Sequence, residues 1–199
     1  NDTTLPIITS PAAPLTVECD GLGNTVQLNT WLNNNGGATA SDLCSSPLQI
    51  TWRTPVLVNT QALCGGTRIL TYRFVAVDAC NNESLPIFST FTIHDNTLPL
   101  ISSPATNLVV ECDGAGNISQ LQIWLNGQGN AVASDICSSP VIWQYDLVGT
   151  QVQCGRTGTY TYRFTVTDAC GNTSTTQANF IIIDTTSPQI TTVATNFDA

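Results

Sequence analysis

The stretch Tyr160-Thr-Tyr-Arg-Phe-Thr-Val-Thr-Asp168 alternates apolar and polar residues. Its aromatic residues and Val166 would face one side of an extended chain, while the threonines and the arginine would face the other. This period of two is typical of an antiparallel strand with one buried face. After the turn Asp168-Ala-Cys-Gly-Asn172, the stretch Ala178-Asn-Phe-Ile-Ile-Ile183 alternates in the same way. Together they predict a hairpin.

The same pattern occurs twice in the chain. The matching segments are Glu18-Cys-Asp-Gly21 with Glu111-Cys-Asp-Gly114, Ser41-Asp-Leu-Cys-Ser-Ser-Pro47 with Ser134-Asp-Ile-Cys-Ser-Ser-Pro140, and Tyr72-Arg-Phe74 with Tyr162-Arg-Phe164. We therefore define a first repeat, 1–94, and a second repeat, 95–183. Residues 184–199 are a linker and the start of a third repeat, because Asp184-Thr-Thr-Ser-Pro188 and Ala194-Thr-Asn-Phe197 match Asp95-Asn-Thr-Leu-Pro99 and Ala105-Thr-Asn-Leu108.

Each repeat is predicted to be mostly β. Further short strands are expected at 15–18, 48–52 and 55–58, separated by Gly, Pro, Asn and Ser. One short helix is expected at 24–36, with Asn24 as its cap and Gly36 as its end, because Leu28, Trp31 and Leu32 have helical spacing. Roughly seven short strands with frequent turns predict an immunoglobulin-like sandwich. The fold class is therefore all-β: tandem immunoglobulin-like β-sandwiches, each with one short helix insertion and two disulfides.

Eight cysteines, four per repeat at corresponding places, indicate a disulfide framework and hence an exported protein. In an immunoglobulin-like sandwich, Cys44 and Cys80 would lie at one pole and Cys19 and Cys64 at the other. Of the three pairings that four cysteines allow, this geometry predicts Cys19–Cys64, Cys44–Cys80, Cys112–Cys154 and Cys137–Cys170.

Charge excludes several partners. Fourteen acidic residues against five basic ones give a net charge of −9, which repels phosphate backbones and anionic lipid. Nucleic acid is therefore not expected as a partner. The segment carries no apolar run long enough to insert in a membrane and no leader, so we expect such elements elsewhere in the parent chain.

The combination of motifs resembles the repeat modules of giant surface adhesins of gliding Bacteroidetes. The motifs are Val-Glu-Cys-Asp-Gly, Ala-Ser-Asp-x-Cys, Cys-Gly-x-Thr, Tyr-Arg-Phe-x-x-x-Asp-Ala-Cys-x-Asn and Asp-x-Thr-x-Pro. A more distant similarity links them to the hyalin repeat. Asn81-Asn82 departs from the usual Gly-Asn, which Gly171-Asn172 keeps. The resemblance implies a long filament on the bacterial cell surface, exported by type IX secretion, that supports attachment and gliding motility.

Catalysis is not expected. A repeated enzyme should repeat its chemistry, yet the single histidine, His94, is replaced by Ile183 in the second repeat. Glu18 and Asp20 could suggest a glycosidase pair, but no sugar cleft with aromatic platforms is indicated beside them. The four tryptophans, Trp31, Trp52, Trp124 and Trp143, are interpreted as core anchors.

Two function classes remain. The first is a structural spacer whose partners are the neighbouring repeats, with surface polysaccharide or the gliding and secretion machinery as further candidates. The second is a module that binds polysaccharide, ice or a protein through an exposed strand face bearing Thr161, Thr165 and Thr167. Val75 and Val77 replace the latter two in the first repeat, which favours the spacer.

Aspartates recur where repeats would meet. They are Asp2, Asp42 and Asp78 in the first repeat and Asp95, Asp135 and Asp168 in the second. Three converging carboxylates, with Asn172 as an additional amide ligand, would suit calcium, which prefers oxygen ligands. Zinc would need histidines and free thiolates. Two alternatives stay open: the aspartates cap their own turns, or the cation loop is Asp20-Gly-Leu-Gly-Asn24 and its copy Asp113-Gly-Ala-Gly-Asn117.

Overall fold

The computed structural model describes residues 2–192, and the match at 194–197 lies outside this range. The chain divides into two compact units. The first contains the residues up to Leu100 together with Ala133–Ile142 and Val166–Ser174; the second contains Ile101–Val132, Trp143–Thr165 and the chain from Thr175 onward. The repeats are defined by sequence similarity, whereas the compact units are defined by contacts between residues. The two divisions differ because the segments Ala133–Ile142 and Val166–Ser174 of the second repeat belong to the first unit.

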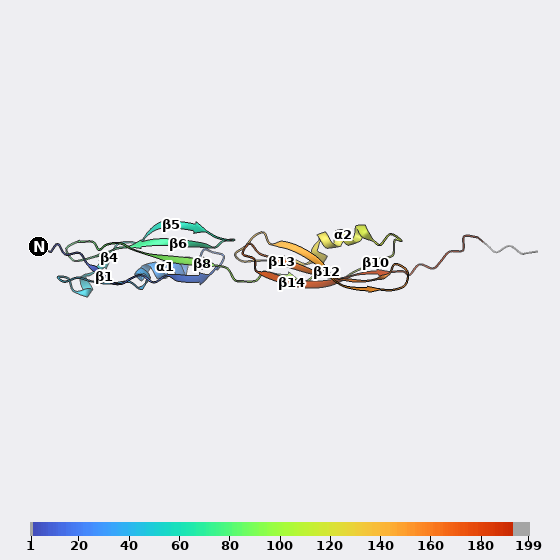
Figure 1. Ribbon diagram of the computed structural model, residues 1–199, viewed down its shortest axis with the longest axis horizontal. Coiled ribbons are helices and arrows are strands. Elements are labelled where there is room, and N and C mark those ends of the chain that lie inside the picture. Colours follow the sequence, from blue (N-terminus) through green and yellow to red (C-terminus); the bar gives the residue numbers. More distant parts are fainter. Residues whose placement is uncertain (1, 193–199) are drawn as a thin grey trace, which may run out of the picture. The chain divides into compact units, whose positions relative to one another are not determined.

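The first unit is built on a four-stranded sheet in the order β2-β8-β6-β5 (Figure 1). Its strands are β2 (Leu15–Glu18), β5 (Val56–Ala62), β6 (Arg68–Phe74) and β8 (Ile87–His94). Two small sheets, β1-β3 and β4-β7, complete it, with β1 (Ile7–Ser10), β3 (Thr39–Ser41), β4 (Thr51–Trp52) and β7 (Ala76–Val77). The prediction of an all-β, immunoglobulin-like sandwich is confirmed.

Strand β8 forms two ladders of opposite sense. It pairs antiparallel with β6, so that Leu70 lies opposite Phe91, as expected for a hairpin-rich sheet. On its other side it pairs in parallel with β2, with Leu15 opposite Phe91. The parallel pair joins the early strand of a repeat to its last strand, and the alternation of residues did not predict it because both kinds of ladder place alternate side chains on opposite faces.

The short helix of the first repeat is α1 (Thr25–Asn33), followed by the 3-10 turn η1 (Asn35–Gly37). Trp31 is buried and its ring meets Tyr72, Phe74 and Phe91 at centroid distances of 5.4–5.9 Å. Its indole N–H donates to the carbonyl of Ala13, at 2.9 Å, which satisfies the one polar atom of this anchor.

The second repeat follows the same plan. Its elements are β9 (Leu100–Ser103), β10 (Leu108–Glu111), α2 (Ile118–Asn126), η3 (Gln128–Asn130), β11 (Val132–Ser134), β12 (Ile142–Val152), β13 (Gly158–Thr167) and β14 (Thr173–Ile183). The strand order β10-β14-β13-β12 repeats that of the first sheet, and β10 is again parallel to β14. Trp124 from α2 occupies the place of Trp31 and donates to the carbonyl of Thr106. Residues 184–192 contain no helix or strand.

Three local expectations were wrong. Asn24 stands before α1 in the left-handed region, with φ 53°, and its side chain does not cap the helix. Instead its Nδ2 donates to the carbonyl of Glu18. The helix ends at Asn33, before Gly36, which lies in η1 with φ 64°. The strand expected at 48–52 is reduced to β4, because the proline-led segment before it forms the 3-10 turn η2 (Pro47–Gln49).

Candidate functional site

Three aspartates of the second repeat converge within the first unit. Asp95 follows β8, Asp135 follows β11 and Asp168 follows β13. One carboxylate oxygen of each lies within 4.8 Å of the others. Asp95 and Asp168 are buried and Asp135 is half-buried. The structure therefore brings together the three carboxylates that the sequence placed at this position.

Each carboxylate also caps a turn of its own. Asp135 Oδ1 accepts the backbone N–H groups of Cys137 and Ser138, both at 2.8 Å. Asp168 Oδ1 accepts those of Cys170 and Asn172, also at 2.8 Å. The turn-capping interpretation is thus correct for these oxygens, and it does not compete with metal binding because it uses only one oxygen of each carboxylate.

The remaining oxygens differ: Oδ2 of Asp95 accepts from the hydroxyl of Ser138 at 3.3 Å and Oδ2 of Asp168 accepts from Nδ2 of Asn172 at 2.8 Å. Asp135 Oδ2 is buried and has no hydrogen-bond partner among the described residues. The pKa of Asp95 is raised above its ordinary value, first by burial and then by the charges of Asp135 and Asp168. An orphaned buried carboxylate oxygen beside two further carboxylates is an environment that a hard divalent cation would relieve.

The first repeat holds an equivalent cluster. Oxygens of Asp2, Asp42 and Asp78 lie within 4.8 Å of one another. Asp42 Oδ1 accepts the N–H groups of Cys44 and Ser45, as Asp135 does for its own turn. Oδ2 atoms of Asp2 and Asp42 are buried without a partner among the described residues. The donor set, all oxygen and repeated with the sequence, fits calcium in both clusters.

Asn172 lies beside the second cluster but turns its amide nitrogen toward it. Its Nδ2 donates to Asp168 Oδ2 at 2.8 Å and to the carbonyl of Asp95 at 3.1 Å. Asn82 makes the same two bonds in the first repeat, with Asp78 and Asp2. Asn172 is therefore not placed as the predicted amide ligand. Its side chain instead connects Asp95 of the linker to Asp168 of the turn by hydrogen bonds.

The rival cation loops are closed by their own hydrogen bonds. Asp20 Oδ1 accepts from the N–H groups of Leu22 and Asn24, at 2.8 and 2.9 Å. Asp113 binds Ala115 and Asn117 in the same way. Neither loop belongs to a group of three acidic or other ligand residues within residues 2–192. These aspartates are turn-forming residues.

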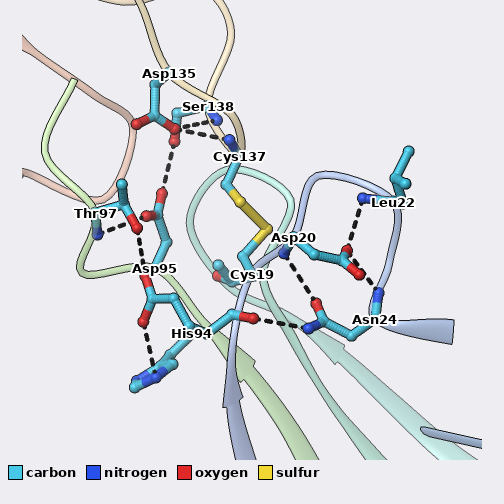
Figure 2. Close-up of a disulfide and its surroundings, with 12 residues drawn as sticks. Cys19, Asp20, Leu22, Asn24, His94, Asp95, Thr97, Asp135, Cys137 and Ser138 are labelled. Atoms are coloured by element: carbon cyan, nitrogen blue, oxygen red, sulfur yellow. Dashed lines mark hydrogen bonds and ion pairs between the residues drawn. A yellow bond between two sulfur atoms is a disulfide. The ribbon is translucent and has the colours of Figure 1, made fainter. Parts of the chain in front are cut away.

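The disulfides differ from the predicted pairing. Cys19 is joined to Cys137, with the Cα atoms 6.1 Å apart, and Cys64 to Cys170, at 5.0 Å. Figure 2 shows the first of them beside Asp95 and Asp135. The pairs Cys19–Cys64, Cys44–Cys80, Cys112–Cys154 and Cys137–Cys170 are not formed, and four thiols within the described chain are free: Cys44, Cys80, Cys112 and Cys154.

Both bonds link the first repeat to the second, and all four half-cystines lie in the first unit. The partner of each bonded cysteine lies in the adjoining repeat and not in its own. The reason is the close approach of two loops: the N–H of Gly66 donates to the carbonyl of Cys137 at 2.8 Å. A Cβ on Gly21 would lie 2.7 Å from the carbonyl oxygen of Ile136, so only glycine permits this contact.

Glu18 has a role that the sequence did not indicate. Its Oε1 accepts from the N–H and the hydroxyl of the linker residues Asn96 and Thr97, both at 2.8 Å, and its Oε2 lies 3.0 Å from His94 Nε2. The hydrogen bond from Asn96 is the main cause that lowers the pKa of Glu18. Glu18 therefore contacts and positions the linker, and His94 is a half-exposed residue at the end of β8.

The threonine face proposed for ligand binding is only half exposed. Thr161, Thr165 and Thr167 are all intermediate in burial, and the hydroxyl of Thr161 is hydrogen-bonded to Asn179 at 2.8 Å. Trp31 and Trp124 are buried, and Trp52 and Trp143 pack partly buried against the two cores. None of the helices in residues 2–192 is long and apolar enough to cross a membrane.

The chain matches no protein-family model and no curated protein sequence. Among solved structures it is similar to EC1-2 of human mucin-like protocadherin, with 10% identity, a TM-score of 0.31, and coverage of 90% of this chain and 98% of that one. It is also similar to extracellular cadherin domains 1-5 of protocadherin gamma B2, with 11% identity, a TM-score of 0.38, and coverage of 94% and 41%. Because both scores are below 0.5, nothing that those proteins bind or join is carried over to this chain.

Proposed function

We propose that this chain is part of the spacer region of a long extracellular adhesin on a bacterial cell surface. The observation that carries the proposal is the pair of bonds Cys19–Cys137 and Cys64–Cys170, which connect consecutive repeats rather than stabilising each repeat alone. Such bonds persist in oxidising surroundings outside the cell. Covalent connection between repeats is useful where a chain must hold a distal part away from the surface without being cut.

Calcium at the two carboxylate clusters completes this proposal. The buried, unpartnered Oδ2 of Asp135 supports it, and so does the pKa of Asp95, which burial raises first and the charges of Asp135 and Asp168 raise further. Asp95, Asp135 and Asp168 would supply oxygen ligands, and the bound ion would remove the repulsion between them. The ion would thereby join the linker to the two turns.

The resemblance to gliding-adhesin repeats supports a finer version of the proposal. In that version the parent protein leaves the cell by type IX secretion, and its partners are the adjoining repeats, the gliding machinery and surface polysaccharide. The chain itself has no catalytic role. The spacer is favoured over a ligand-binding module because the threonine face is half-buried and partly hydrogen-bonded to Asn179.

Two measurements test the spacer role. A glycan array and an ice-affinity assay on the 199-residue chain should show no binding, and strong binding in either would favour the ligand-binding alternative. Limited proteolysis of the oxidised chain should leave its fragments connected on a non-reducing gel, and reduction should release them. Rapid degradation of the oxidised chain to separate fragments would contradict a protease-resistant spacer.

A further inference from the structure

The four free thiols are the sequence equivalents of the four bonded cysteines. Cys112 and Cys154 correspond to Cys19 and Cys64, while Cys44 and Cys80 correspond to Cys137 and Cys170. Each observed bond joins one cysteine of the first kind to one of the second. We call the loops that carry the first kind of cysteine the exit loops: 18–24 and 63–67 in the first repeat, and 111–117 and 153–157 in the second. We call the turns that carry the second kind the entry turns: 42–45 and 78–82 in the first repeat, and 135–138 and 168–172 in the second.

The unpaired exit loops have the conformation of the bonded ones. Asn117 Nδ2 donates to the carbonyl of Glu111 at 2.8 Å, as Asn24 does to Glu18 at 2.7 Å. The N–H of Thr157 donates to the carbonyl of Cys154, matching Thr67 and Cys64. The loops that carry Cys112 and Cys154 are therefore preformed without a disulfide.

Glu111 also repeats the linker contact of Glu18. It accepts from the N–H and hydroxyl of Thr185, at 2.7 and 3.1 Å, and from the hydroxyl of Thr186. Thr185 and Thr186 correspond to Asn96 and Thr97. The segment after the second repeat is thus held as the linker after the first repeat is held.

Free surfaces remain where the bonded loops meet a partner. Cβ atoms added at Gly21 and Gly65 would lie 2.7 Å and 2.6 Å from Ile136 and Ser138, whereas at the equivalent Gly114 and Gly155 no atom of residues 2–192 lies within 4 Å. On the unpaired entry turn, Leu43 is 90% exposed, whereas its equivalent Ile136, which contacts Gly21, is 62% exposed. Both halves of a second junction are therefore present, and the contacts that Gly21, Gly65 and Ile136 make across the first junction are not made by their equivalents Gly114, Gly155 and Leu43 among the described residues.

We propose that the exit loops of the second repeat bind the entry turns of another copy of this repeat chain, forming Cys112–Cys44 and Cys154–Cys80 disulfides between molecules. In an array the partner is the adjoining repeat, and for this chain in isolation it is a second copy. This proposal rests on the proposed function only because it assumes that every junction between repeats is built like the one formed by Cys19–Cys137 and Cys64–Cys170. Residues 184–186 must then give way to Asp2 and its neighbours, which correspond to Asp95 and the linker.

One residue of the free exit loops departs from the bonded ones. Arg156 replaces Gly66, and its side chain donates to the carbonyl of Gly114. A Cβ at Gly66 would lie 3.3 Å from the carbonyl oxygen of Cys137, so the new junction needs a shift of a few tenths of an ångström at this loop. The backbone N–H that Gly66 donates is retained in arginine.

Each bond is formed by thiol–disulfide exchange with a low-molecular-weight disulfide such as oxidised glutathione. The Cys112 thiolate attacks it and releases one glutathione, and the Cys44 thiolate of the second molecule then displaces the other. Two protein thiols and one glutathione disulfide give one protein disulfide and two glutathione thiols. Cys154 and Cys80 react in the same way.

The test uses the folded chain with its two native disulfides intact, incubated with oxidised glutathione. The wild-type chain should give a ladder of covalent oligomers on a non-reducing gel, with Cys112–Cys44 and Cys154–Cys80 as the cross-linked peptides. Cys44→Ser/Cys80→Ser and Cys112→Ser/Cys154→Ser should each remain monomeric alone. Their equimolar mixture should stop at a dimer, because each partner has one blocked end.

Other products would overturn the proposal. Bonds within one molecule, Cys44–Cys80 or Cys112–Cys154, would show that the terminal cysteines pair inside a repeat. Dimers of either variant alone, a ladder of equal yield from the urea-denatured chain, or a wild-type chain that stays monomeric would also refute specific head-to-tail docking. In all these cases the spacer proposal would still be decided separately by the binding and proteolysis measurements.

Discussion

Asp95 and Asp135 approach each other with carboxylate oxygens within 4.8 Å, and Oδ2 of Asp135 has no hydrogen-bond partner in the described chain. Two acids held in this way cost free energy unless a cation or a proton lies between them. The junction between the repeats is therefore a place where ionic conditions should act strongly on the molecule, as is the equivalent cluster of Asp2, Asp42 and Asp78.

Calcium should raise the thermal midpoint of the first unit. At a concentration one hundred times the dissociation constant, a ligand of the folded state adds about 2.7 kcal/mol, or roughly 5–10 °C for a chain of this size. Because the first unit holds two such clusters, this gain applies to each of them, and Asp135→Asn should remove the part due to the second cluster and leave the part due to the first. Asp113→Asn, which alters a turn-forming aspartate outside the clusters, should leave the calcium response intact. Equal midpoints with calcium and with a chelator would leave turn capping as the only role of the clusters.

The pH dependence of stability should change in Asp95→Asn. Because the pKa of Asp95 is raised in the folded state, that state binds the proton more tightly than the unfolded chain does. Without calcium, its contribution to stability should fall as pH rises from about 3.8, the ordinary value, through the raised pKa. The free energy of unfolding of the wild-type chain minus that of Asp95→Asn, measured with denaturant from pH 3 to 8, should show this fall. A difference that rises with pH would contradict the prediction.

Removal of the junction disulfide by Cys19→Ser/Cys137→Ser should lower the free energy of unfolding of the first unit by up to ~4 kcal/mol, since the bond closes a long loop of the unfolded chain. Cys112→Ser/Cys154→Ser is the matched control, because these thiols are free in the single chain. Denaturant curves measure both. An equal loss in the two variants would argue against the observed pairing.

Glu18→Gln should weaken the hold on the linker. The variant keeps the size of the side chain but removes the charge that strengthens its bonds to the N–H of Asn96 and to Thr97. Hydrogen exchange should become faster at the Asn96 amide and stay unchanged at Thr185. Glu111→Gln should show the reverse. Faster exchange at both amides in either variant would mean that the effect is global.

Trp124→Ala should destabilise the second unit by about 3–5 kcal/mol, as large-to-small changes of buried aromatic residues do. The ring meets Tyr162, Phe164 and Phe180, and its N–H is bonded to Thr106. Tryptophan fluorescence and chemical denaturation would report the loss. Exposed Leu147→Ala on β12 serves as the control and should have little effect.

The sequence predicted what depends on short-range pattern. The alternation around Phe164 gives β13, and the helical spacing of Leu28 and Trp31 gives α1. The recurrence of Asp135 and Asp168 before cysteine turns was sufficient to place the carboxylate cluster. These features follow from periodicity and turn chemistry within one repeat.

What the sequence did not predict depends on contacts between repeats. Cys19 and Cys112 have the same neighbours in sequence, so spacing alone cannot distinguish a bond to the same repeat from a bond to the next. The linker contact of Glu18 is likewise invisible, because Asn96 lies 78 positions away. The glycine at position 21, which recurs as Gly114, could have indicated that another segment approaches this loop closely. It does not indicate which segment that is.

The bond between Cys19 and Cys137 also determines how far the molecule can be drawn out. When the two ends are pulled apart, tension passes from the first repeat to the second through the sulfur atoms, and the 118 positions between them need not carry it. At about 3.5 Å per extended residue, that segment would otherwise add roughly 400 Å of contour length on unfolding. In a filament made of such repeats, a covalent bond would have to break before this length could be released, so the filament would extend less under load than one without disulfides between its repeats.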